Sequence, residues 1–117
     1  MKQRNARPRG RAGVEPLHRA AALKPLLDAL LAMRTPKEMR GFMDDLCTPA
    51  ELEAIADRWR VVPLLLKGAP YREIHDRTGV SVTTIGRIAR CLSFGAGGYR
   101  LAADRVLGSA SKRRRSQ

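Results

Sequence analysis

The segment SVTTIGRIARCL, residues 81–92, carries small, hydroxyl-bearing and cationic side chains at helical spacing. Ile85 and Ile88 lie three residues apart and predict an apolar face that packs inward. The residues left to face outward are Val82, Thr83, Gly86, Arg87 and Arg90. Small residues permit close approach, a threonine hydroxyl donates or accepts hydrogen bonds, and a guanidinium group suits guanine or phosphate. This face is therefore suited to binding a polyanion.

A second short helical pattern, YREIHDRT at residues 71–78, precedes this segment and must position it. The parts of a helix-turn-helix follow in order: an apolar anchor, a glycine that can end a helix, a residue that fills the angle and a serine N-cap. These residues are Ile74, Gly79, Val80 and Ser81. We predict a helix-turn-helix over about residues 70–92, with Arg72 placed to reach a DNA backbone or groove rim.

A helical hairpin with a purely structural role would give the same pattern. The charge of the chain distinguishes this interpretation from a DNA-binding helix-turn-helix. The chain has 23 Lys and Arg against 11 Asp and Glu, a net charge of +12. This excess favours a nucleic-acid partner. His75 occupies a position where such turns usually hold a small residue, and we expect its side chain to face solvent.

Most of the excess charge lies at the two ends of the chain. Residues 1–13 hold five Lys or Arg and residues 109–117 hold four, with no acid in either segment. Removing these nine from the total of 23 leaves 14 basic against 11 acidic residues in 14–108. We predict two disordered basic tails that add affinity for a polyanion, or that only solubilise the chain. No hydrophobic span, basic amphipathic helix, lipidation motif or secretory signal favours a membrane partner.

Neither the cysteines nor the histidines form a pattern typical of catalysis. Cys47 and Cys91 lie far apart with no CxxC pattern, and His18 and His75 stand in unrelated contexts. No glycine-rich phosphate loop, Ser/His/Asp order or metal-ligand cluster is present. We therefore expect a protein that is not an enzyme, with no metal or cofactor, in the reducing cytoplasm.

Four further helical segments must support the helix-turn-helix. Residues 15–33 carry a broad leucine and alanine stripe, as one helix or as two halves that meet at Pro25. Thr35 followed by Pro36 starts a second helix that ends near Leu46. Thr48 and Glu51 form a capping box that starts the longest helix.

The longest helix is expected to stop at Lys67-Gly68 and to bend near Trp59, because Pro63 lies inside it. Its inward residues are predicted as Leu52, Ile55, Ala56, Trp59, Val62, Leu65 and Leu66. A last helix is predicted over residues 99–107, with Leu101, Ala102 and Val106 inward. The fold class is all-α, with about six helices in one domain over residues 14–108. Its apolar faces are too extensive for one small bundle, which favours a dimer with a shared core over a monomer.

Residues 46–107 resemble the Trp repressor superfamily, and its YerC/YecD branch most closely. The resemblance is carried by LCTPAELEAIADRWRVVPLLLKG, by YREIHDRTGVSVTTIGRIARCL and by SFGAGGYRLAADRVL, with RCLSFGAGGY the most branch-specific part. It implies an intertwined all-helical homodimer with one DNA-reading head per subunit and a near-palindromic operator. By position it also implies that Arg72, Val82, Thr83 and Gly86 face bases, while Thr84 and Arg90 face the DNA backbone.

The same resemblance implies an effector site that departs from the tryptophan-sensing repressor. Thr48 and Arg58 match positions that hold the tryptophan ligand there, and Arg87 matches the arginine that stacks on the indole. However, Ile88 replaces a glycine beside the ring, and Cys91 replaces a serine that helps bind the ligand. A branched side chain removes the room that a planar ring needs, so we expect another small ligand, or none, in place of tryptophan.

These inferences predict a DNA-binding transcriptional regulator, a repressor acting as a homodimer on a palindromic operator. The alternative is an RNA-binding or protein-interaction helical bundle, because basic tails bind DNA and RNA alike through electrostatics. Sequence-specific binding to duplex DNA distinguishes the two.

Overall fold

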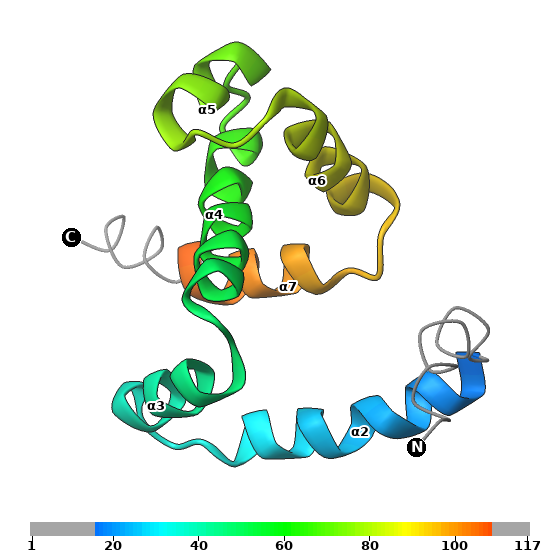
Figure 1. Cartoon of the computed structure of the whole chain (residues 1–117). Helices are drawn as coiled ribbons and strands as arrows, with labels where there is room; N and C mark the ends of the chain where they lie inside the picture. The colour runs from blue at the N-terminus through cyan, green and yellow to red at the C-terminus, as the bar shows by residue number, and fades with distance from the viewer. Residues whose placement is uncertain (1–15, 109–117) are drawn as a thin grey trace, which may run out of the picture. The chain divides into compact units, whose positions relative to one another are not determined.

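The computed structural model describes residues 16–108, and this part is helical throughout, with no strand (Figure 1). The elements are α2 (Pro16–Ala32), α3 (Pro36–Leu46), α4 (Pro49–Leu66), α5 (Tyr71–Thr78), α6 (Val82–Phe94), α7 (Gly98–Ala103) and the π-helical turn η1 (Asp104–Gly108). The all-α class with about six helices is confirmed. Both predicted tails, 1–13 and 109–117, lie outside the described residues.

The chain divides into two compact units, Met1–Leu46 and Cys47–Gln117. In the first unit, α2 runs as one helix through Pro25. Thr35 caps α3 as predicted, because its hydroxyl accepts a hydrogen bond from the Glu38 amide at 3.0 Å. The Glu38 carboxylate accepts a second bond from the Arg34 amide at 2.8 Å, so two free donors at the helix start are satisfied.

The first unit has no buried interior among its described side chains, residues 19–46. Three leucines on α2, spaced four residues apart and therefore on one face, remain open to solvent. Leu23 is 49% exposed, Leu27 is 47% exposed and Leu31 is 84% exposed. A helix with such an uncovered apolar face requires another surface to shield it.

In the second unit, α4 begins and ends where local signals predict. The Glu51 amide donates to the Thr48 hydroxyl at 3.1 Å, and the Thr48 amide donates to the Glu51 carboxylate at 2.8 Å, which completes the capping box. At the other end Lys67 is the C-cap and Gly68 adopts a φ of +82°. The helix continues through Pro63, whose carbonyl accepts from the Lys67 amide at 3.1 Å.

The core of the second unit is an apolar cluster that α4, α5, α6 and α7 share. Its buried members are Val61, Val62, Ile74, Ile85, Ile88, Leu92 and Ala103. Burial of Val62, Ile74, Ile85 and Ile88 confirms the predicted inner faces. Val80 packs against the cluster from the turn, as predicted. Because α4 contacts each of the other three helices, it acts as the support for the helix-turn-helix.

The predicted inner face of α4 is partly wrong for the single chain. Ile55 is 40% exposed, Leu66 is 42% exposed and Ala56 is also exposed, whereas Val61 is fully buried. The half of α4 that carries Val61 and Val62 enters the cluster, and earlier residues lie outside it. Periodicity marks an apolar face but does not show how far along the helix its neighbours reach.

The predicted inner face of the last helix is also partly wrong for the single chain, where Ala102 is half-buried. Leu101 is 50% exposed and Val106 is 59% exposed, while Ala103 is buried and Tyr99 and Leu107 pack against the cluster. Tyr99 and Ala103 lie four residues apart on α7 and so share a face, from which Leu101 points away. Beyond Ala103 the chain winds as a π-helical turn, whose wider spacing alters the register that Val106 would have in an α-helix.

Truncating Ile85 should strongly destabilise the second unit. We expect Ile85→Ala to lower the free energy of unfolding by about 2–5 kcal/mol, since the side chain is fully buried and its loss leaves a cavity. Val82→Ala on the same helix is the control, because Val82 is 51% exposed, and should change it by less than about 0.5 kcal/mol. Urea denaturation at one protein concentration measures both, and equal losses would contradict this packing.

Candidate nucleic-acid interface

The turn between α5 and α6 has the predicted helix-turn-helix geometry. Gly79 ends α5 in the left-handed conformation, with a φ of +79°, and its amide donates to the His75 carbonyl at 2.8 Å. Ser81 caps α6, because its hydroxyl accepts from the Thr84 amide at 3.1 Å. The predicted roles of Gly79 and Ser81 are both confirmed.

Two side chains of α5 hold this turn closed. The Thr78 hydroxyl donates to the Ile74 carbonyl at 2.7 Å and accepts from the Val80 amide at 3.1 Å. His75 Nδ1 lies 2.8 Å from the Val80 carbonyl oxygen. A carbonyl can only accept, so Nδ1 carries the proton in this bond. His75 is exposed as predicted, but its structural bond across the turn was not foreseen.

Two arginines from outside the motif bind the last turns of its helices. Arg60 of α4 forms an ion pair with Asp57 at 3.2 Å and also donates to the Arg77 carbonyl, near the end of α5, at 3.2 Å. Arg100 of α7 donates from Nε to the Leu92 carbonyl, near the end of α6, at 3.1 Å. Helix C-terminal carbonyls lack partners within the helix, so a cation there is favourable. The C-terminal end of α5 is thereby bonded to α4, and the C-terminal end of α6 is bonded to α7.

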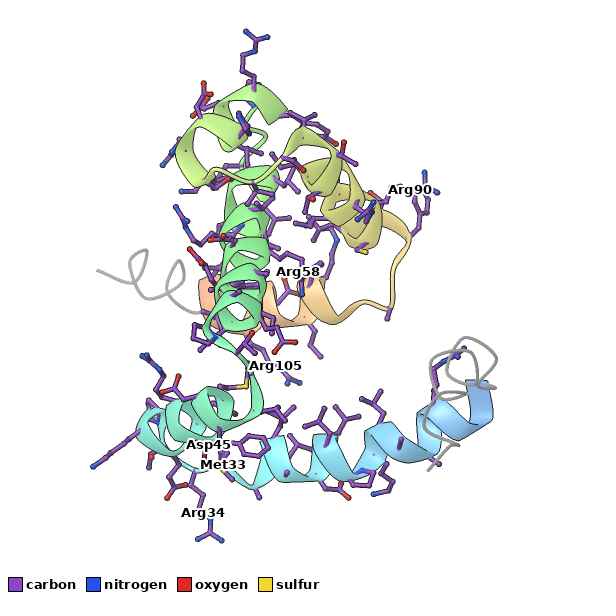
Figure 2. The ribbon with its side chains drawn as sticks, in the orientation of Figure 1. Met33, Arg34, Asp45, Arg58, Arg90 and Arg105 are labelled. Carbon is purple, nitrogen blue, oxygen red and sulfur yellow. The ribbon has the colours of Figure 1, made fainter. Side chains whose placement is uncertain are left out.

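The outward side of α6 carries the predicted candidate residues on one face. Their spacing of i, i+1, i+4, i+5 and i+8 places them on a common face, opposite the buried Ile85 and Ile88. Gly86 is half-buried, and the other four are exposed: Val82, Thr83, Arg87 and Arg90. Arg90 projects from α6 away from α4 (Figure 2). The structure therefore brings these five residues together.

The second helix of the motif, α6, carries positive charge and no acid. No acidic residue occurs between Asp76 and Asp104, so the whole of α6 carries only positive charge. Within the described part of the chain, Arg72, Arg87 and Arg90 make no hydrogen bond or ion pair, in contrast to Arg77, which pairs with Glu73 at 3.4 Å. These three guanidinium groups keep all their donors available for a ligand.

Thr84 is half-buried and has a different hydrogen-bonding role from Thr83. The Ser81 hydroxyl donates to the Thr84 hydroxyl oxygen at 3.0 Å, while the Thr84 amide donates back to Ser81. This arrangement orients the Thr84 hydroxyl and leaves its own proton free to donate. Thr84 can therefore donate to an anion that approaches the N-terminus of α6, where the helix dipole also favours negative charge.

Gly86 lies beside an aromatic ring that was not singled out in the sequence. A β-carbon added at Gly86 would lie 3.9 Å from Cε2 of Tyr71, the first residue of α5. That separation is an ordinary van der Waals contact. The Tyr71 ring therefore lies beside this turn of α6 and leaves room for a β-carbon, and Tyr71 joins the candidate surface.

The predicted effector residues differ in their burial and in their contacts. The Thr48 hydroxyl is engaged as the cap of α4, and Val61, where α4 enters the core, lies about 20 Å farther along the helix axis. Arg58 is exposed on α4 between them (Figure 2), and Cys91 is exposed on α6. Ile88 is only 3% exposed and belongs to the apolar cluster.

The described residues, 16–108, offer no metal centre and no membrane-spanning helix. No group of three or more His, Cys, Asp or Glu side chains there could hold a metal ion. None of the helices in that range combines the length and apolar character needed to cross a membrane. Cys47 and Cys91 are both free thiols. The outward face of α6 is therefore the best-developed candidate site in this part of the chain.

The fold and this face define a helix-turn-helix protein with a cationic second helix. A sequence model of the Trp repressor protein family matches residues 21–107. The chain belongs to the Trp repressor family, a family of regulators rather than enzymes. The resemblance drawn from the sequence is thereby confirmed.

Individual relatives agree with this assignment. The uncharacterized protein YerC of Bacillus subtilis (strain 168) is 39% identical over 88 residues, which cover 75% of this chain and 85% of YerC. A crystal structure of a TrpR-like protein from Eubacterium eligens ATCC 27750 is 31% identical with a TM-score of 0.70, covering 74% of this chain and 89% of its own. A crystal structure of a candidate Trp repressor from Staphylococcus aureus is 33% identical with a TM-score of 0.70. The match covers 79% of this chain and 94% of the Staphylococcus aureus chain.

The space above Gly86 predicts that alanine is tolerated there. We expect Gly86→Ala to keep the fold and to raise the free energy of unfolding by up to about 1 kcal/mol, because alanine favours a helix interior over glycine. Gly79→Ala is the matched control and should lower it by roughly 1–2 kcal/mol, because a β-carbon is strained at its positive φ. Urea denaturation compares the two variants. If Gly86→Ala lowered the free energy of unfolding as much as Gly79→Ala, there would be no room for a β-carbon at Gly86.

Proposed function

We propose that this protein is a sequence-specific, DNA-binding transcriptional regulator, a repressor that acts as a homodimer on a palindromic operator at the nucleoid in the cytoplasm. The observation that carries the proposal is the acid-free outward face of α6, where Arg87 and Arg90 pair with no residue among 16–108 and the opposite face is buried. A fold that used these arginines for its own stability would pair them, as it pairs Arg60 and Arg77. Membership of a regulator family supports the same conclusion.

In this proposal α6 enters the major groove with its N-terminal half, as the second helix of the motif does in related architectures. Thr83 offers a hydroxyl and a methyl to base edges, and Val82 and Gly86 allow close approach. Arg72, exposed at the start of α5, reaches a base from the groove rim. Thr84 and Arg90 contact phosphates, and Arg87 binds guanine or phosphate.

The homodimer in the proposal would cover apolar surface that a single chain leaves open. None of the described side chains in residues 19–46 is buried, and Leu31 is 84% exposed. In the second unit Leu101 and Val106 are also exposed. A second copy would bury such faces by a self-complementary contact, and its two-fold axis would match a palindromic operator.

The proposal gives tryptophan no role as corepressor. Ile88 fills its position from within the apolar cluster, so its side chain occupies room that a planar ring would require. Cys91 offers a thiol, which is a weak hydrogen-bond partner for an ammonium group. Any effector at Thr48, Arg58 and Arg87 is therefore a different small molecule.

A random pool of duplex DNA tests the proposal directly. Selection by the full-length protein should enrich a near-palindromic sequence, and adding tryptophan at fixed salt should leave both its identity and its affinity unchanged. Sequencing of the bound fraction and titration of the enriched duplex are the measurements. A protein that enriches no duplex, but binds RNA or a protein partner, would support the alternative of an RNA-binding or protein-interaction bundle.

Substitutions on α6 test which residues read the sequence. Thr83→Ala and Gly86→Ala should each change the enriched sequence, with about 1–3 kcal/mol less discrimination at the contacted base pair. Lys67→Ala is the control, because Lys67 is an exposed cation at the far end of α4 from Thr48 and outside the motif. Repeating the selection with each variant measures the effect.

Removing residues 1–13 and 109–117 gives a contrasting result in the same assay. Affinity should fall for every duplex and the dependence on salt should flatten, while the enriched sequence stays the same. If the Thr83 and Gly86 variants kept the full preference of the parent protein, α6 would not be the recognition helix.

A further inference from the structure

Tyr71 joins the two helices of the motif on their exposed side. It is the first residue of α5 and directly precedes Arg72. A β-carbon at Gly86 of α6 would lie 3.9 Å from Cε2 of the Tyr71 ring. The ring therefore lies over Gly86, which follows Val82 and Thr83 by about one helical turn on the outward face.

Packing within the protein does not account for the whole Tyr71 side chain. It is 40% exposed, so burial of the ring is incomplete. Its hydroxyl makes no hydrogen bond within residues 16–108, and Pro70 at the N-cap provides no side-chain partner for the start of α5. A tyrosine of this kind combines an apolar ring held by the protein with a polar tip free to bind elsewhere.

The surroundings of Tyr71 select the kind of partner. Arg72 is adjacent, and neither it nor the arginines of α6 has an ion pair in the described part of the chain. The first helix of a helix-turn-helix crosses the DNA backbone while the second enters the groove. A hydroxyl at the start of that first helix is thus positioned toward phosphate, and tyrosine is among the side chains that donate to phosphate oxygens.

We infer that Tyr71 is a DNA-contacting residue whose hydroxyl donates to a backbone phosphate while its ring lies beside Gly86 of α6. The inference rests on the proposed function. Phosphate contacts position the protein without reading bases, so Tyr71 acts on affinity and register.

Tyr71→Phe tests the hydroxyl without disturbing the ring. On the duplex enriched by the parent protein, and on a scrambled duplex of equal length, affinity should fall by about tenfold alike. The salt dependence should stay unchanged because no charge is removed, whereas Arg72→Gln should reduce its slope. Tyr99→Phe is the matched control: Tyr99 is the other tyrosine, half-buried on α7 against the core, and its variant should bind within about twofold of the parent.

The outcomes separate this inference from the function on which it depends. If the parent protein binds no duplex DNA, both the proposed function and the role of Tyr71 are wrong. A parent protein that enriches a palindrome, together with a Tyr71→Phe variant of equal affinity, overturns the role of Tyr71 alone. Weakening confined to the enriched duplex would overturn the phosphate assignment, because it would mean that the hydroxyl reads a base. Urea denaturation should give the same unfolding curve for Tyr71→Phe and the parent.

Discussion

The packing of Ile85 and Ile88 into the apolar cluster is the constraint on which the rest of the second unit depends. Burying an apolar side chain of this size contributes roughly 1.5–3 kcal/mol, so the inner face of α6 cannot turn outward without a large loss. A helix buried along one face must present the opposite face to its surroundings. Placement of Thr83 and Arg90 on the outside is therefore a consequence of what is buried within.

Hydrophobic burial alone has little direction, and polar contacts with defined geometry add to the packing of α5 against α6. Thr78 and His75 close the turn, and Arg60 and Arg100 hold the last turns of the two helices. Each bond contributes only about 0.5–1.5 kcal/mol, but each has a required geometry. Arginines that support the fold are bonded within the protein, whereas those of the outward face, such as Arg87, have no ion pair or hydrogen bond with the described residues. Support and ligand binding are thus assigned to different side chains.

Ile88 links the fold to the question of effector binding. In the resemblance to the tryptophan-sensing repressor this position is a glycine beside the indole, and here the side chain completes the apolar cluster. The structure shows that this side chain stabilises α6 from within the cluster. The proposal that no tryptophan ring binds here rests on that placement together with the resemblance.

Signals that act within a few residues were sufficient to predict the helices, their caps and the turn. The caps at Thr48 and Ser81 and the left-handed Gly79 follow from bonds and backbone angles that span at most five residues. What depends on distant neighbours was not predictable: the bond from Arg60 to a carbonyl 17 residues away, and the ring of Tyr71 over α6. The same holds for the buried face of α7. A helical pattern describes which side chains share a face, but only tertiary packing decides which face is covered and how far.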